Sequence, residues 1–195
     1  MKATFYFVVE VKDSYNNTIK LKNGLEVMVN NTIDSVEHIN RVGKVISAPR
    51  GTKASAGDMI LFHHNICRDA WGFKGTKRTS MFQISPNHYF VPIPEIFMIN
   101  RADSEGWEAV DPFVFIKPIP APVHKLSNGL EVVQNDYKGM DESVGEVAFV
   151  NKTLEMQGVK NGDLITFEEY SQHEYIIDGE LYYKMKTSDV LAIVS

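Results

Sequence analysis

The chain contains a single cysteine, Cys67, among its 195 residues, so no disulfide can form within it. A lone cysteine fits a reducing compartment, where disulfides are rare. The sequence also lacks any apolar run near the roughly 18 residues that a membrane-spanning helix requires. The first ten residues alternate as a strand does, and Glu10 and Lys12 interrupt the apolar run, which is unlike a signal peptide. We therefore expect a soluble, cytoplasmic protein with no membrane partner.

An excess of positive charge is missing too. The 20 Lys and Arg are outnumbered by 25 Asp and Glu, which gives a formal net charge of −5. Binding to nucleic acid without sequence preference needs clustered Lys and Arg, so no nucleic acid partner is expected. The chain also lacks a Gly-x-Ser-x-Gly elbow, a phosphate-binding loop and a dinucleotide fingerprint. The sequence predicts a protein that is not an enzyme, with no catalytic residue and no cofactor of its own.

One short segment suggests a metal, because His63, His64 and Cys67 lie close together. Zinc sites usually draw four ligands from at least two clusters, and the sequence has no second cluster. Successive residues of a strand also point to opposite faces, which would separate the two imidazoles. No metal site is expected.

Helical periodicity is absent from every window of about 11 residues. Short runs of aromatic and β-branched residues, bounded by Gly, Pro, Asn and Asp, predict strands instead. These runs are Phe5–Val11, Val42–Ser47, Met59–Phe62, Phe113–Lys117, Gly145–Val150 and Leu164–Phe167. Short strands at close spacing predict an all-β fold, with each module a small barrel or sandwich.

The chain repeats itself. Four blocks recur in the same order, which predicts two copies of one small module. Asn23–Val27 returns as Asn128–Val132, Val42–Val45 as Val144–Val147, Ala56–Phe62 as Asn161–Phe167, and Glu95–Ile99 as Asp189–Ile193. Each copy has a Gly-Asp pair before a buried strand, where Gly can adopt a positive φ and Asp can bond its own backbone.

These blocks divide the chain into residues 1–102 as a first module, 103–110 as a linker and 111–195 as a second module. The first module is longer because of an insertion at residues 65–88. That insertion interleaves aromatic and basic residues, a pattern that can bind single-stranded nucleic acid. Because the chain is acidic and the patch is small, an additional hairpin or a subunit contact is the favoured interpretation.

The second copy shows a further set of segments in a characteristic order: Asp111–Pro118, Ser127–Val132, Gly145–Val147, Val159–Phe167 and Ser188–Val194. Together they resemble the GroES-like co-chaperonins, the chaperonin 10 family. The resemblance implies two tandem GroES-like small β-barrels. Tandem modules of this kind occur in chloroplast co-chaperonins and diverged ones in bacteriophages, and the Asn and Tyr content is compatible with a phage origin.

The resemblance also implies a function. Members of the family form oligomeric rings that cap a GroEL-type chaperonin through mobile loops and assist ATP-dependent folding of unfolded substrates in its chamber. ATP would then be bound by the chaperonin partner. The alternative is a GroES-fold structural or interaction module, for example a phage protein, that no longer binds chaperonin. A homo-oligomeric ring is expected, although two modules per chain cannot give seven modules from whole chains alone.

The mobile loops supply the predicted binding site. Its residues are Asn23, Gly24, Leu25, Glu26, Val27 and Met28 in the first loop, and Asn128, Gly129, Leu130, Glu131, Val132 and Val133 in the second. Leucine and valine are expected to enter the apolar groove of the chaperonin. The glutamates depart from the family pattern, and strand alternation would turn them to solvent. The alternative from the residues alone is a plain hairpin after an Asn-Gly turn.

A second departure concerns two short segments, Ala48–Ala56 and Asn151–Val159. In the family the corresponding segment forms a roof hairpin that narrows the top of the dome. Because both segments are short, we expect this hairpin to be missing or reduced, which would give an open-topped cap.

Overall fold

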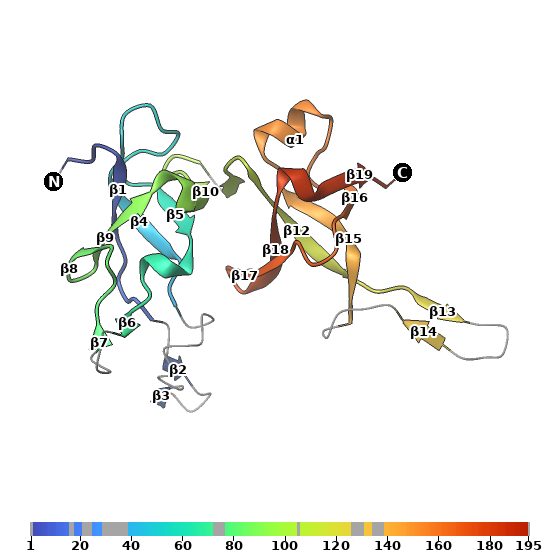
Figure 1. The fold of residues 1–195 in the computed structure, drawn as a ribbon, viewed down its shortest axis with the longest axis horizontal. Helices are drawn as coiled ribbons and strands as arrows, with labels where there is room; N and C mark the ends of the chain where they lie inside the picture. Colours follow the sequence, from blue (N-terminus) through green and yellow to red (C-terminus); the bar gives the residue numbers. More distant parts are fainter. Residues whose placement is uncertain are drawn as a thin grey trace. The chain divides into compact units, whose positions relative to one another are not determined.

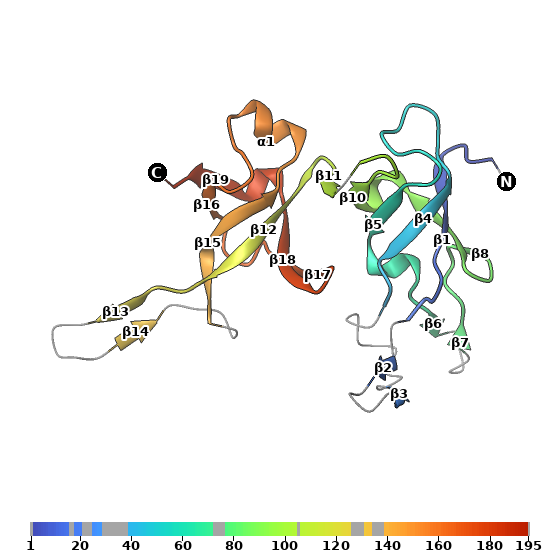
Figure 2. The same cartoon turned by 180° about the vertical axis from the view of Figure 1, so that it is seen from behind.

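The computed structural model divides the chain into two compact units, Met1–Trp107 and Glu108–Ser195, each with one main β-sheet. Figures 1 and 2 show them from opposite sides. The structure describes residues 2–15, 18–20, 25–28, 39–71, 77–104, 106–125, 131–133 and 139–194. Among these residues, no helix has the length and apolar character needed to cross a membrane.

The main sheet of the first unit has seven strands in the order β11-β10-β5-β4-β1-β9-β8, and its edge strand β11 spans the point where the chain divides into units. Two short ladders lie outside it, β2 with β3 and β6 with β7. The 3₁₀ helices η2 (His64–Ile66) and η3 (Ile93–Glu95) follow β5 and β9. The strands are β1 (Tyr6–Glu10), β2 (Thr18–Lys20), β3 (Glu26–Met28), β4 (Val42–Ser47), β5 (Met59–Phe62), β6 (Ala70–Trp71), β7 (Lys77–Arg78), β8 (Gln83–Ser85), β9 (His88–Pro92), β10 (Ile96–Asn100) and β11 (Trp107–Ala109).

The second unit is built on a six-stranded sheet with the order β17-β18-β12-β15-β16-β19, and a separate ladder joins β13 and β14. A short helix, α1 (Lys152–Met156), connects β15 to β16, and the 3₁₀ helix η4 (Thr187–Asp189) precedes the last strand. The strands are β12 (Phe113–Pro120), β13 (Val123–Lys125), β14 (Glu131–Val133), β15 (Met140–Phe149), β16 (Leu164–Phe167), β17 (His173–Ile177), β18 (Glu180–Lys186) and β19 (Val190–Ile193).

The two sheets follow the same strand order. In the first unit it reads β10-β5-β4-β1-β9-β8, and in the second β19-β16-β15-β12-β18-β17. The registers match as well, because Val9 pairs with Val45 while Ile116 pairs with Val147. Each of these pairs lies beside a shift in register, which is typical of a β-bulge.

The turns before β5 and β16 share a positive φ at glycine and a hydrogen bond to the aspartate side chain. Gly57 and Gly162 both have positive φ, 101° and 90°, a conformation that glycine adopts without strain. The Asp58 side chain accepts a bond from the Ser55 amide at 2.8 Å, and the Asp163 side chain accepts one from the Lys160 amide at 2.7 Å. Both parts of the turn signal read from the sequence are therefore confirmed.

The core of each unit covers both faces of its central strands, because three or more successive residues are buried in β1, β5, β12 and β18. In the second unit it is formed by buried side chains of the central strands and α1, including Ile116, Val147, Leu154, Ile165 and Phe167. In the first unit the corresponding strands bury Val9, Val45, Ile60 and Phe62. Strand β4 is buried on one face only: buried Val45 alternates with exposed Ile46, the period-2 pattern of a half-buried strand.

The all-β fold is confirmed, since α1 is the one α-helix within the described ranges. One part of the prediction needs correction, because neither sheet closes into a barrel in the described residues. Closure requires the edge strands to pair, and in the first unit the edge strand β8 has three residues and a register shift in its ladder to β9. Such short, irregular strands usually end a sheet.

Two further expectations can be compared with the structure. Residues 48–56 contain no strand, and residues 151–159 form α1 and a turn, so the absence of a roof hairpin is confirmed in both units. The insertion at residues 65–88 contains the ladder of β6 with β7, as the hairpin interpretation predicts.

Candidate functional site

Each unit has one short hairpin that leaves the sheet between its first two long strands. In the first unit, β2 pairs with β3 between β1 and β4, and in the second, β13 pairs with β14 between β12 and β15 (Figure 1). The registers correspond, with Lys20 opposite Glu26 and Lys125 opposite Glu131. The two hairpins therefore occupy equivalent positions in the two sheets.

The predicted contact residues are divided between described and undescribed segments. Those in the described ranges lie on, or just before, the second strand of each hairpin: Leu25, Glu26, Val27, Met28, Glu131, Val132 and Val133. The remaining ones lie outside the described residues: Asn23, Gly24, Asn128, Gly129 and Leu130. Leu25 is 59% exposed, so an apolar side chain stands at the surface at the predicted position. The paired strands are those that the Asn-Gly alternative predicts, and contact with a partner stays a prediction.

Hydrogen bonds close the base of the first hairpin segment. The backbone amide of Asn40 donates to the carbonyl of Ser14 at 2.9 Å, and Tyr15 forms a β-bridge with Ile39. The Tyr15 hydroxyl also accepts a bond from the Asp69 amide at 2.9 Å. These bonds hold the two ends of the segment together and tie it to the chain between η2 and β6.

The second hairpin segment has a comparable base. The Ala121 amide donates to the carbonyl of Gly139 at 3.0 Å, next to the pairing of Pro120 with Met140. This arrangement is suited to a recognition loop on a rigid scaffold.

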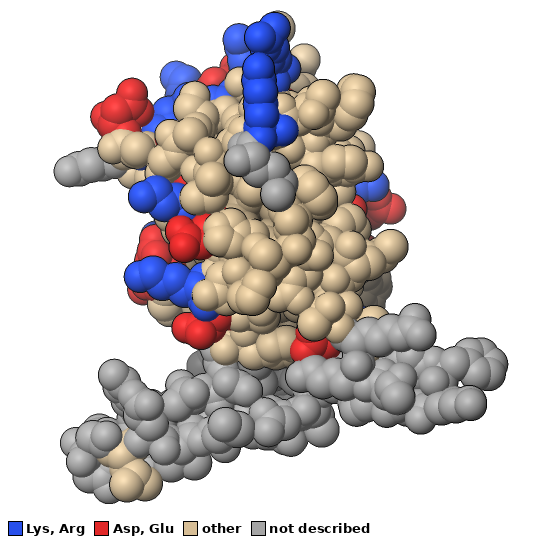
Figure 3. All heavy atoms as spheres, turned by 90° about the vertical axis from the view of Figure 1, so that its left-hand side faces the viewer, with Lys and Arg blue, Asp and Glu red and all other residues tan. Residues whose placement is uncertain are grey.

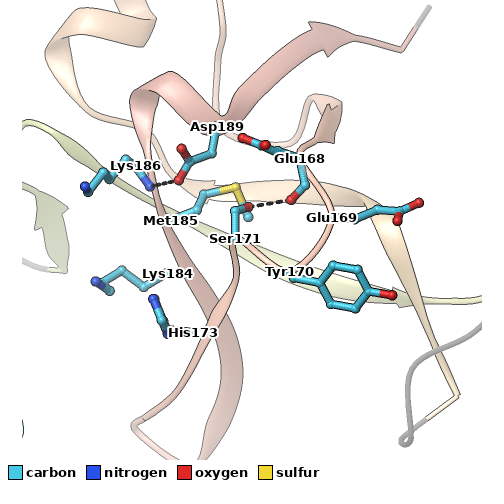
Figure 4. Close-up of a pocket in the computed structure, with 9 residues that line it drawn as sticks. All are labelled: Glu168, Glu169, Tyr170, Ser171, His173, Lys184, Met185, Lys186 and Asp189. Atoms are coloured by element: carbon cyan, nitrogen blue, oxygen red, sulfur yellow. Dashed lines mark hydrogen bonds between the residues drawn. The ribbon is translucent and has the colours of Figure 1, made fainter.

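The second unit also contains a polar pocket of about 350 Å³ (Figure 4). The Ser171 hydroxyl donates to the carbonyl of Glu168 at 2.6 Å, so its proton is directed to the backbone rather than to His173. Burial lowers the pKa of His173, nearby Lys184 lowers it further, and Asp189 opposes the shift. The pocket is lined by Glu168, Glu169, Tyr170, Ser171, His173, Lys184, Met185, Lys186 and Asp189.

Lys184 in this pocket is 8% exposed, which is unusual for a lysine. Its ammonium lies 4.6 Å from the centre of the Phe113 ring and 5.9 Å from that of Tyr175. Contact with aromatic faces stabilises a cation that has lost part of its hydration. This lysine therefore has a structural role between strands β12, β17 and β18.

The His63–Cys67 segment has little capacity to bind a metal. Burial, with a smaller contribution from Asp69, raises the pKa of the Cys67 thiol to about 12, so it stays protonated at neutral pH. The thiolate is the form that binds metals. In the described part of the chain, no three His, Cys, Asp or Glu side chains converge in a way that could hold an ion.

An apolar surface lies on strands β1 and β9 of the first unit. Phe5, Tyr6 and Phe90 are exposed there, and the rings of Tyr6 and Phe90 lie 6.1 Å apart between centroids. Figure 3, which looks at the left-hand side of Figure 1, shows a broad face with few charged side chains. Exposed aromatic clusters of this kind are typical of interaction surfaces.

The structure brings together a charged group that the sequence interpretation missed. Arg41, His63, His64 and Arg68 gather at the end of β5, since the first of them precedes β4 and the others follow β5. The signal was available in the repeat. Extending the Ala56–Phe62 alignment by two positions sets His63-His64 against Glu168-Glu169, so imidazoles in one copy correspond to carboxylates in the other.

Comparison with known proteins gives two matches. The family model described as "Chaperonin 10 Kd subunit" matches residues 126–194. A curated relative, the co-chaperonin GroES of Rhodothermus marinus, is 34% identical over 85 residues, which cover 42% of this chain and 84% of the relative. The family match thus starts in the second hairpin segment and ends after β19.

Proposed function

Because this chain belongs to the chaperonin 10 family, we propose that it is a co-chaperonin that caps a GroEL-type chaperonin ring and assists ATP-dependent protein folding. The family is one of co-chaperonins rather than of enzymes. ATP is bound by the chaperonin, and unfolded substrates occupy the chamber beneath the cap. The protein acts in the cytoplasm, which is that of the host if it is encoded by a phage.

The observation that carries the proposal is the family match over residues 126–194. It spans β14 of the second hairpin and every later strand of the second sheet. The first unit has the same strand order, the same bulge beside the Val9–Val45 pair, and a hairpin at the equivalent position. These correspondences support two GroES-like modules in tandem, each supplying one loop.

The loops act through their apolar residues. Leu25 and Val27 in the first, and Leu130 and Val132 in the second, enter grooves of the chaperonin, and burying one such side chain contributes about 1.5–3 kcal/mol. Ordering each loop residue costs roughly 1–2 kcal/mol, so a single contact is weak. Several loops on one ring then add up to useful avidity. Weak individual contacts let the nucleotide state of the chaperonin decide between binding and release.

The cap is a homo-oligomeric ring. Strand β19 supports this proposal, because no further strand lies beside it within the described residues, whereas β10, its counterpart in the first unit, lies between β5 and β11. An uncovered edge presents unpaired backbone groups that a strand of another chain can bind.

The test is co-sedimentation with a chaperonin ring in the presence and absence of ATP. The double change Leu25→Asp and Leu130→Asp should abolish nucleotide-dependent binding, since a carboxylate in an apolar groove costs several kcal/mol. The matched control, Glu26→Ala with Glu131→Ala, should leave binding largely intact because these residues face solvent in the proposed complex.

Equal loss from both double changes would contradict the assignment of contact residues. A folded protein that binds no chaperonin ring under any nucleotide condition would instead support the alternative, a GroES-fold interaction module without capping activity.

A further inference from the structure

The base of the first hairpin segment lies against the insertion that lengthens the first unit. Residues 63–88 separate the end of β5 from Tyr89, whereas only residues 168–182 separate the end of β16 from Tyr183. The two tyrosines are equivalent, because Tyr89 pairs with Val9 and Tyr183 pairs with Ile116. Figures 1 and 2 both show β6 and β7 of the insertion at the same end of the first unit as β2 and β3.

Two adjacent side chains, Ser14 and Tyr15, connect this base to the insertion. The Tyr15 hydroxyl accepts the bond from the backbone amide of Asp69 at 2.9 Å. The Ser14 hydroxyl is hydrogen-bonded to the Tyr89 hydroxyl at 2.5 Å. The side-chain amide of Gln83 donates to the same tyrosine hydroxyl at 3.4 Å. We call these three bonds the tether, since they join the base of the segment to the insertion at two places.

The insertion is itself fixed to the interior of the first unit. Ile66 and Cys67 are buried, and the Ser80 hydroxyl donates to the carbonyl of Ile66 at 2.6 Å. Tyr89 is buried as well, and burial raises the pKa of its phenol, while the bond to Ser14 opposes the shift. The phenol therefore keeps its proton at neutral pH. The tether thus holds the base of the segment against buried parts of the chain.

The equivalent positions of the second unit cannot form such a tether. Counted along the chain from the matched bulges, Ala121 takes the place of Ser14. The next residue, Pro122, takes the place of Tyr15. Neither alanine nor proline has a side-chain group that can form a hydrogen bond. The base of the second hairpin segment is closed by the backbone, through the bond between Ala121 and Gly139.

We propose that the tether makes the first hairpin segment the stronger of the two chaperonin contacts. The tether holds the base of the segment and not the predicted contact position, where Leu25 is 59% exposed. A loop with a fixed base loses less conformational freedom when a partner orders it, so more of the contact energy remains as affinity. Ser14 and Tyr15 are therefore positioning residues that act through the loop. This role rests on the capping function proposed above.

Chains with a single working loop test the proposal. Leu130→Asp leaves only the first loop, and Leu25→Asp leaves only the second. In ATP-dependent co-sedimentation with a chaperonin ring, the Leu130→Asp chain should bind about tenfold more tightly. Adding Ser14→Ala with Tyr15→Phe removes the two tether hydroxyls of the base. This change should weaken binding about tenfold in the Leu130→Asp chain and leave the Leu25→Asp chain unaffected.

Tyr170→Phe with Ser171→Ala is the matched control. It removes the same two hydroxyls from an adjacent pair that lies outside both hairpin segments. Binding of both single-loop chains should stay unchanged. A general loss of structure on removing the tether would weaken the two single-loop chains alike, so the difference between them reports on positioning.

Hydrogen exchange of the free protein measures the tether without any chaperonin. The backbone amide of Asp69 donates to Tyr15, so it should exchange at least about tenfold faster in the Tyr15→Phe chain. The amide of Val147, which donates to the carbonyl of Asp163 in the second unit, should exchange at an unchanged rate.

The outcomes separate the tether from the capping function. A Leu130→Asp chain that binds no better than the Leu25→Asp chain overturns the proposal, as does equal weakening of both when the tether is removed. Faster exchange at Asp69 without any effect on binding overturns this inference alone. A wild type that binds no chaperonin ring overturns the capping function, and the stronger contact with it.

Discussion

Single residues explain how closely the strands of this fold approach each other. Gly43 and Gly145 occupy matching positions in β4 and β15. A Cβ on Gly145 would lie 2.5 Å from Cδ1 of Ile116 and 3.1 Å from the carbonyl oxygen of Lys117. A Cβ on Gly43 would meet the side chains of Val9 and Val11 in the same way. Glycine is needed at both positions because a neighbouring side chain fills the space.

Gly145→Ala should therefore lower the free energy of unfolding by about 1–3 kcal/mol, the usual cost of overpacking. The loss should be smaller in an Ile116→Val background, since that change removes the methyl group nearest to the new Cβ. Urea unfolding of the four chains measures both effects. If Gly145→Ala lowers the free energy of unfolding equally in both backgrounds, contact with Ile116 is not the cause of the destabilisation.

A second residue, His64, links stability to pH. Burial, followed by the charges of His63, Arg41 and Arg68, lowers its pKa from 6.5 to about 4. The folded state therefore holds fewer protons on this ring than the unfolded state between these values. The contribution of the neutral His64 ring to the free energy of unfolding is fully present above pH 6.5 and is lost as the pH falls through about 4.

His64→Gln should accordingly reduce the loss of stability between pH 6.5 and pH 4. The measurement is the urea midpoint of variant and wild type at several pH values in this window. The Asp and Glu side chains that titrate in the same pH window are present in both proteins, so the difference between the two profiles reports on His64. If the urea midpoints of the two proteins change with pH in parallel, His64 does not contribute to the loss of stability.

Among the elements, β19 has features suited to assembly. Leu191, Ile193 and Val194 are 65%, 46% and 41% exposed, in or next to a strand at the end of its sheet. Such exposed apolar edges mark sites of strand pairing with another chain.

Leu191→Lys with Ile193→Lys should reduce the oligomer to smaller species, because charge on an edge strand opposes pairing with another chain. The stability of the single chain should change little, since both side chains are already exposed. Light scattering gives the mass. Ile176→Lys, at an exposed position of β17, is the control and should leave the mass unchanged. An unaltered oligomer in the β19 variant would place the interface elsewhere.

For the whole molecule, the presence of two units in one chain limits how a ring can form. Rings built from whole chains contain an even number of modules, whereas a seven-module ring needs an unequal use of units or a second kind of chain. The missing roof hairpins, at residues 48–56 and 151–159, would leave the top of such a ring open.

Much of the fold could be predicted from local sequence. The strands Val42–Ser47, Met59–Phe62 and Leu164–Phe167 were predicted with the bounds that the structure shows. The Gly-Asp turns were predicted as well. These features depend on neighbouring residues alone: apolar alternation, and a glycine that can adopt positive φ. For the same reason the Asn-Gly motifs indicated hairpins at both sites.

Other features depend on residues that are distant in the sequence. Open sheets rather than barrels, the bases of the hairpins and the cation–aromatic contact of Lys184 all require strands to be placed side by side. The sequence by itself determined the β-class, the repeat and the family resemblance, because these are properties of order and spacing along one chain. Only the tertiary structure decided that Arg41 would join His63, His64 and Arg68, because charges act through space and the sheet sets the distances between them.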